Sequence, residues 1–119
     1  MPLHKETKVL GFISREDQLT LMQAAVAVMQ PSLFEGWSTV VEDAKSMSVP
    51  LVASAISVHQ EQFADYGVKL FFAPEDAADL KRCMVQVLDG NLTAQPYAYK
   101  QNLIRFAHDF MNIANSITA

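Results

Sequence analysis

The sequence has little that would point to a membrane, an oxidising compartment or a nucleic acid. Its 119 residues contain one cysteine, Cys83, so no internal disulfide is expected and a reducing, cytoplasmic location is favoured. Its longest apolar runs, such as 24–29, are far shorter than the roughly 20 residues of a membrane-spanning helix. No apolar segment follows Met1, so we expect no signal peptide. The net charge of −4 argues against a protein that binds the phosphate backbone of nucleic acids, since such proteins are normally basic.

What the sequence does have is enough apolar material for a core. Half of the residues are hydrophobic and 18% are charged, which excludes an intrinsically disordered chain. The length corresponds to about one small domain. Because the sequence contains no repeat, low-complexity segment or linker, we expect residues 1–119 to form a single unit.

Short apolar segments that alternate with helical patterns predict an α/β fold. The four expected strands are 9–13, 24–29, 50–54 and 68–72. Continuous apolar character is typical of parallel strands that helices cover on both faces. Right-handed crossovers between such strands give a Rossmann-like, three-layer α/β/α arrangement with a sheet of about four strands.

The expected helices lie between and after these strands, at 14–23, 38–47, 58–63, 75–89 and 96–117. Ser14 is the predicted N-cap of the first helix, and Gly90 is the left-handed cap that ends the fourth. Cys83 lies on an apolar face of the fourth helix and is interpreted as a small core residue. The apolar stripe from Leu103 to Ile117 on the last helix is interpreted as a packing surface.

The loop after the second expected strand is the candidate binding site. Ligands bind at the carboxyl ends of the strands in a parallel sheet, and a helix N-terminus attracts anions. Gly36 would let a ligand approach the backbone closely, and Glu35 would accept hydrogen bonds from its hydroxyl groups. Asp43, eight residues further on, would be a second acceptor.

Each of these residues also has an interpretation without function. Glu35 could be a solvated loop acid, Trp37 a core anchor, and Ser38 and Thr39 ordinary helix caps. The residues by themselves therefore indicate only a candidate anion site at a helix start. His59 is interpreted as a surface or capping residue rather than a ligand at a second site.

The segment 30–44, QPSLFEGWSTVVEDA, resembles the donor-site signature of GT-B glycosyltransferases, specifically glycosyltransferase family 4 (group 1). This signature has proline-serine, then glutamate-glycine, then a second acid eight residues after the first. The resemblance includes 10–17, 50–54 and 58–62, and it spans roughly residues 8–114.

The resemblance implies a nucleotide-sugar donor site in an enzyme that retains anomeric configuration and needs neither a metal nor a further cofactor. Glu35 would be the catalytic acid that hydrogen-bonds the donor sugar, and Asp43 would hold the ribose. The residues that would face the sugar and the diphosphate are Gly36, Trp37, Ser38, Thr39 and Val40. Catalysis there consists mostly of stabilising charge on the departing diphosphate.

Two positions depart from the family pattern. Ser48 stands where the family usually has glycine, which concerns the end of the helix 38–47. Ala55 stands where related sequences often have aspartate. Neither position touches the two proposed donor acids.

The resemblance also implies that the chain is the second half of a donor-binding domain, without the acceptor domain and without the first two strands. In the strand order 3-2-1-4-5-6, two missing strands would separate 9–13 from 24–29. We therefore expect either that these two strands pair directly or that the chain forms a homodimer across the open edge of 24–29.

Three functions are compatible with these observations. The first is the donor-binding part of a glycosyltransferase, inactive without the rest of the enzyme. The second is a stand-alone oligomerising or interaction module derived from this fold without catalysis. The third is a free-standing nucleotide-sugar binder.

Overall fold

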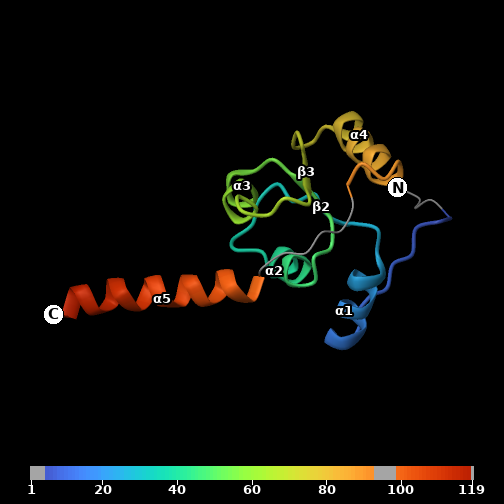
Figure 1. Cartoon of the computed structure of the whole chain (residues 1–119). Helices are drawn as coiled ribbons and strands as arrows, with labels where there is room; N and C mark the ends of the chain where they lie inside the picture. The colour runs from blue at the N-terminus through green and yellow to red at the C-terminus, as the bar shows by residue number, and fades with distance from the viewer. Residues whose placement is uncertain (1–4, 93–98, 119) are drawn as a thin grey trace.

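The computed structural model describes residues 5–92 and 99–118. The chain forms a three-stranded parallel sheet in the order β1 (Val28–Gln30), β2 (Leu51–Ser54) and β3 (Lys69–Phe72) (Figure 1). Val28 lies opposite Leu51, which in turn lies opposite Lys69. The α/β class and the parallel sheet predicted from the sequence are confirmed.

The described helices are α1 (Arg15–Ala24), α2 (Thr39–Ser46), α3 (Ser57–Gln62), α4 (Ala77–Leu88) and α5 (Tyr99–Thr118). Ser14 is the N-cap of α1, as predicted, because its hydroxyl accepts a hydrogen bond from the backbone N–H of Asp17. Gly90 follows α4 with a φ of 79°, the predicted left-handed conformation. Residues 96–98, at the predicted start of the last helix, lie outside the described residues.

Helices cover both faces of the sheet. Successive residues of a strand point to opposite faces, so Leu51 and Ala53 pack on one side with α1, α2 and the segment after α3. Val52 packs on the other side with Phe72 and with Cys83 of α4. The fold is therefore the expected three-layer α/β/α arrangement. Cys83 is fully buried, which confirms its interpretation as a core residue.

The predicted strand 9–13 does not form. This segment is irregular and exposed, with Val9 at 77% and Phe12 fully exposed, and Gly11 turns the backbone with a φ of 65°. An apolar run becomes a strand only beside a partner strand, and none lies next to this segment in the described part of the chain. Within residues 5–92 and 99–118 the sheet has three strands instead of the expected four, and the expected direct pairing of 9–13 with 24–29 is wrong.

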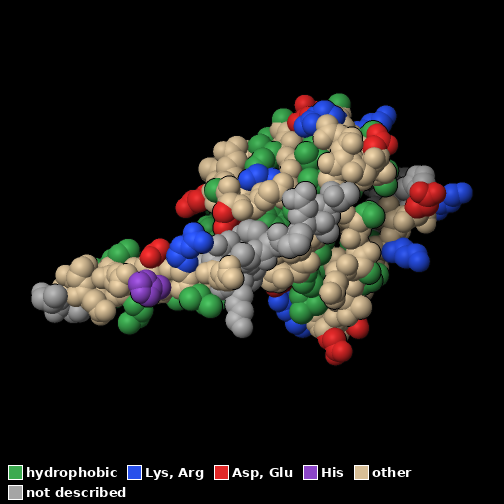
Figure 2. Space-filling view, viewed as in Figure 1, with side chains coloured by type: hydrophobic (Ala, Val, Ile, Leu, Met, Phe, Trp, Pro, Cys, Tyr) green, Lys and Arg blue, Asp and Glu red, His purple; other side chains and the backbone are tan. Residues whose placement is uncertain are grey.

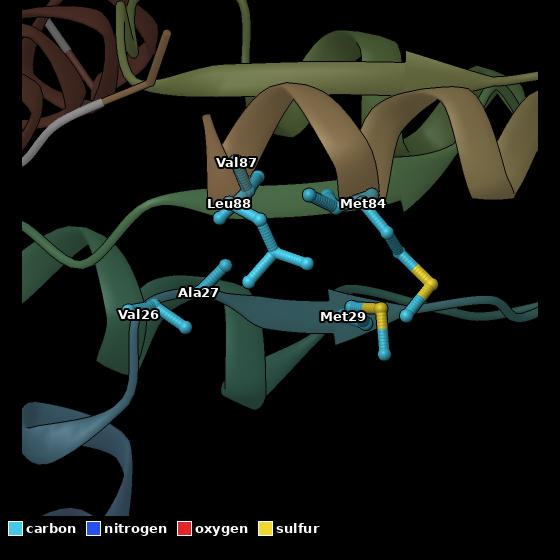
Figure 3. A pocket seen from close by; sticks show the side chains of 7 residues that line it. Val26, Ala27, Met29, Met84, Val87 and Leu88 are labelled. Carbon is cyan, nitrogen blue, oxygen red and sulfur yellow. The ribbon is translucent and has the colours of Figure 1, made fainter. Parts of the chain in front are cut away.

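The predicted strand 24–29 is shorter than expected and shifted along the chain. Ala24 still belongs to α1, because the helix capped by Ser14 continues to that residue. Within the described chain β1 pairs only with β2, so its other edge is open. An apolar groove of about 140 Å³ lies between this edge region and α4 (Figure 3); it is lined by Val26, Ala27, Met29, Val52, Met84, Val87 and Leu88.

Helix α5 extends away from the sheet beside α2 (Figure 1), and hydrophobic side chains are visible on its surface (Figure 2). Leu103, Phe110, Ile113 and Ile117 are each more than half exposed. Most of the surface of these four side chains is not packed within the described chain, so the interpretation of this stripe as a packing surface stays a prediction. The side chain of Phe106 lies outside the described ones.

Candidate functional site

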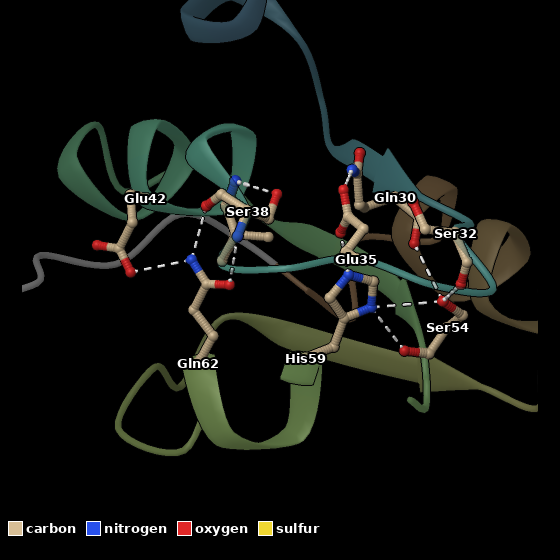
Figure 4. Close-up of polar contacts among 9 residues, drawn as sticks. Gln30, Ser32, Glu35, Ser38, Glu42, Ser54, His59 and Gln62 are labelled. Atoms are coloured by element: carbon tan, nitrogen blue, oxygen red, sulfur yellow. Dashed lines mark hydrogen bonds and ion pairs between the residues drawn. The ribbon is translucent and has the colours of Figure 1, made fainter. Parts of the chain in front are cut away.

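The loop 31–38 joins the carboxyl end of β1 to the start of α2. Ser38 is the N-cap of α2, since its hydroxyl accepts a hydrogen bond from the N–H of Val41, and it is buried. The amide of Gln62 on α3 accepts from the Ser38 N–H at 3.1 Å and donates to the Ser38 carbonyl at 2.7 Å (Figure 4). Gln62 therefore fixes the backbone where α2 begins. The interpretation of Ser38 as a helix cap is confirmed.

Glu35 is held from two sides at the end of β1. The side-chain amide of Gln30 donates to Oε1 at 2.6 Å, and Nε2 of His59 lies 2.7 Å from Oε2 (Figure 4). The side chain of Glu35 is 20% exposed, so the carboxylate has fixed protein partners and keeps some access to solvent. The interpretation of Glu35 as a solvated loop acid is wrong.

His59 is fully buried, which contradicts its interpretation as a surface residue. Its Nδ1 lies 2.8 Å from the carbonyl oxygen of Ser54, and its ring stacks on Phe63 at 5.6 Å between centroids. Two residues separate β2 from α3, so the first turn of α3 folds back over the end of β2. No sequence spacing predicted this contact, because His59 and Glu35 are 24 residues apart.

The other residues of the predicted donor segment lie around this loop. Gly36, Trp37 and Thr39 are exposed and Val40 is half-buried. Apart from Gly36 itself and its two chain neighbours, no atom of the described chain lies within 4 Å of the position that a Cβ would take at Gly36, so a ligand can approach its backbone. The alternative interpretation of Trp37 as a core anchor is wrong, since it is 59% exposed.

Asp43 does not share contacts with Glu35. Its two carboxylate oxygens accept hydrogen bonds from the guanidinium of Arg15, at 2.6 Å each. The hydrogen bond to Asp43 raises the pKa of Arg15 above its ordinary value. Arg15 precedes Asp43 by 28 residues, so no spacing in the sequence predicted this contact.

A second hollow of about 320 Å³ lies at the carboxyl ends of β1 and β3, lined by Pro31, Leu33, Phe72, Glu75, Asp76, Ala77 and Leu80. Its two acids, Glu75 and Asp76, would repel a diphosphate, so it does not fit that part of a donor. No group of three or more His, Cys, Asp or Glu side chains that could hold a metal ion occurs within residues 5–92 and 99–118.

A parallel sheet covered by helices on both faces, with a polar loop where a strand ends, defines a Rossmann-like domain. The family model of group 1 glycosyl transferases matches residues 2–105, and the chain belongs to this family. The family resemblance stated from the motif at 30–44 is thereby confirmed. No curated protein and no solved structure matches the chain.

No described helix has the length and apolar character needed to span a membrane.

Proposed function

We propose that the chain is the nucleotide-sugar donor-binding part of a retaining glycosyltransferase and that it is inactive without the rest of the enzyme. The observation that carries the proposal is the position of Glu35. Gln30 and His59 hold its carboxylate at the carboxyl end of β1, directly before the N-terminus of α2. Membership of the glycosyl transferase family supports a sugar donor as the ligand.

Glu35 is the proposed catalytic residue and binds hydroxyl groups of the donor sugar. A carboxylate offers about four acceptor positions, and the contacts of Gln30 and His59 use two of them. The remaining positions are available to a ligand, because the side chain is not fully buried.

The proposed diphosphate seat is the backbone from Gly36 to Val40. A helix N-terminus carries a partial positive charge and N–H groups without helical partners. The Ser38 N–H donates to the Gln62 side chain, and the Val41 N–H donates to the Ser38 hydroxyl. The backbone N–H groups of Thr39 and Val40 are therefore the proposed donors to phosphate oxygens. Asp43, one turn further along α2, is the proposed ribose acceptor.

The open edge of β1 is the proposed junction with the missing half of the domain. An unpaired edge beside an apolar groove favours the addition of a parallel strand, which would also cover Val26 and Met29. On this proposal residues 1–119 are a partial domain. The proposed compartment is the cytoplasm, as the single cysteine favours a reducing environment.

Titration of the chain with UDP-, GDP- and ADP-sugars, monitored by ligand-observed NMR, tests the donor site. We expect millimolar or tighter binding of one nucleotide class and a loss of about tenfold or more in Glu35→Ala, the effect of removing a charged hydrogen-bond partner. Glu61→Ala, which removes an exposed acid from α3, is the matched control and should bind like the wild type. Absence of binding for all three nucleotides at millimolar concentration contradicts the proposal.

The second candidate is an oligomerising module without catalysis, which forms a homodimer through the open edge of β1. The apolar groove beside that edge and the exposed stripe of α5 favour it. Analytical ultracentrifugation should then show a dimer that Val26→Lys dissociates and Val9→Lys, on the irregular segment before α1, does not. A monomer at every concentration contradicts this candidate.

A further inference from the structure

The buried imidazole of His59 connects the proposed catalytic acid to the end of β2. Its Nε2 lies 2.7 Å from Oε2 of Glu35, and its Nδ1 lies 2.8 Å from the carbonyl oxygen of Ser54 (Figure 4). We propose that His59 is a positioning residue, protonated on both ring nitrogens, that keeps Glu35 ionised and directed toward the donor sugar. This inference rests on the proposed function of Glu35.

The partner of Nδ1 fixes the first proton. A backbone carbonyl oxygen can only accept a hydrogen bond, so Nδ1 must donate to Ser54. The hydroxyl of Ser54 also lies 3.3 Å from Nδ1, but this hydroxyl has one proton and donates it to the carbonyl of Ser32. It therefore offers no proton to Nδ1, and both contacts require an Nδ1–H group.

The contact of Nε2 with Glu35 requires a second proton. Without one, a nitrogen lone pair and a carboxylate oxygen would face each other at 2.7 Å, which is repulsive. The proton is therefore held between His59 and Glu35.

The surroundings favour imidazolium and carboxylate over the neutral pair. Gln30 donates to Oε1 of Glu35 at 2.6 Å, and an N–H donor binds an ionised carboxylate more strongly than a protonated one. A buried imidazolium needs a paired anion, and Glu35 is the ionisable side chain within hydrogen-bonding distance of the ring in the described chain. Phe63 covers the face of the ring.

This arrangement determines what the acid offers to a ligand. The donors from β1 and α3 occupy one lone pair on each carboxylate oxygen and fix its rotamer. The carboxylate stays ionised, and its remaining lone pairs on the exposed side accept hydrogen bonds from sugar hydroxyls. Loss of the Nε2 proton would remove this hydrogen-bond donor, and the lone pair left on Nε2 would repel the carboxylate of Glu35.

Long-range 1H–15N NMR of the free chain at about pH 6.5 tests the proton assignment without any donor. We expect imidazolium 15N shifts for both ring nitrogens of His59, with the signal assigned by its loss in His59→Gln. In Glu35→Gln the side-chain amide donates to Nε2, so the ring should change to the neutral Nδ1–H form. A neutral ring in the wild type would overturn the proposal.

A pair of variants tests the positioning role. His59→Gln retains an N–H donor with the reach to contact Glu35, whereas His59→Asn retains one that reaches only the Ser54 carbonyl. We expect about a tenfold loss of donor affinity in His59→Asn and partial recovery in His59→Gln at comparable unfolding midpoints. Equal affinities of the two variants would overturn the positioning role. If the wild type binds no donor, the proposed function fails, while the NMR result still upholds or overturns the ion pair.

Discussion

Arg15 holds Asp43 through two parallel hydrogen bonds, from Nη1 to Oδ2 and from Nη2 to Oδ1, each 2.6 Å long. This bidentate pair joins the first turn of α1 to the middle of α2. It also occupies both oxygens of the acid that is the proposed ribose acceptor. A nucleotide that uses Asp43 must therefore displace the guanidinium or bind beside it.

Removal of the guanidinium should tighten donor binding. In Arg15→Gln we expect roughly fivefold higher affinity for the nucleotide sugar, because the ribose no longer has to displace the guanidinium from Asp43. The free energy of unfolding should fall only slightly, because the pair is bidentate but the side chain of Arg15 is 59% exposed. Arg82→Gln, which breaks the ion pair with Asp79 on α4, is the matched control and should leave the donor affinity unchanged. Weaker binding in Arg15→Gln would mean that Arg15 contacts the donor itself.

Ser48, the residue after the C-cap of α2, has a φ of 57°, a left-handed conformation that is unfavourable for a residue with a side chain. The left-handed conformation costs a non-glycine residue about 1–2 kcal/mol, and a glycine at this position would remove that cost. Part of the resulting stabilisation is lost, because glycine makes the unfolded chain more flexible. We expect Ser48→Gly to raise the free energy of unfolding by about 0.5–1 kcal/mol in a urea titration. Ser46→Gly, within α2, should lower it by about 0.5–1 kcal/mol. Changes of the same sign in the two variants would contradict the strain at Ser48.

The elements that the sequence predicts well are those defined by short-range chemistry. Ser14 and Ser38 mark the starts of α1 and α2 because each hydroxyl accepts an N–H three residues later. The strand at 9–13 was predicted wrongly because its apolar residues satisfy a local pattern, while a strand also needs a neighbouring edge. Periodicity contains no information about that edge.

The candidate site was predictable only in part. The motif selects Glu35 and Asp43 and contains Gln30, one partner of Glu35, but it does not contain His59 or Arg15, which come from distant segments. His59 is 24 residues from Glu35, and Arg15 is 28 residues from Asp43. These contacts depend on how α3 and α1 pack against the sheet and α2, so a pattern within one loop could not reveal them.

Gln62 should be sensitive to the loss of its amide protons. Its Nε2 donates to the Ser38 carbonyl at 2.7 Å and to Oε1 of Glu42 at 3.1 Å, and the side chain is buried. In Gln62→Glu both donors are lost and a second carboxylate faces Glu42, so we expect a destabilisation of about 2–3 kcal/mol. Gln60→Glu, on the exposed side of α3, should stay within about 0.5 kcal/mol of the wild type. Chemical denaturation measures the free energy of unfolding of the wild type, Gln62→Glu and Gln60→Glu. Equal values would contradict a stabilising role of the buried hydrogen bonds of Gln62.

Cys83 should make stability depend on pH in the alkaline range. Burial raises the pKa of its thiol, and the nearby guanidinium of Arg82 offsets part of this effect. Because the pKa is higher in the folded than in the unfolded chain, the stabilisation is complete below the ordinary thiol pKa. It is lost as the pH rises, since the unfolded chain then releases its proton first. From about pH 8 to pH 10 the free energy of unfolding should fall more steeply in the wild type than in Cys83→Ala, which has no thiol to ionise. Urea titrations at several pH values compare the two slopes, and parallel slopes would contradict a raised pKa at Cys83.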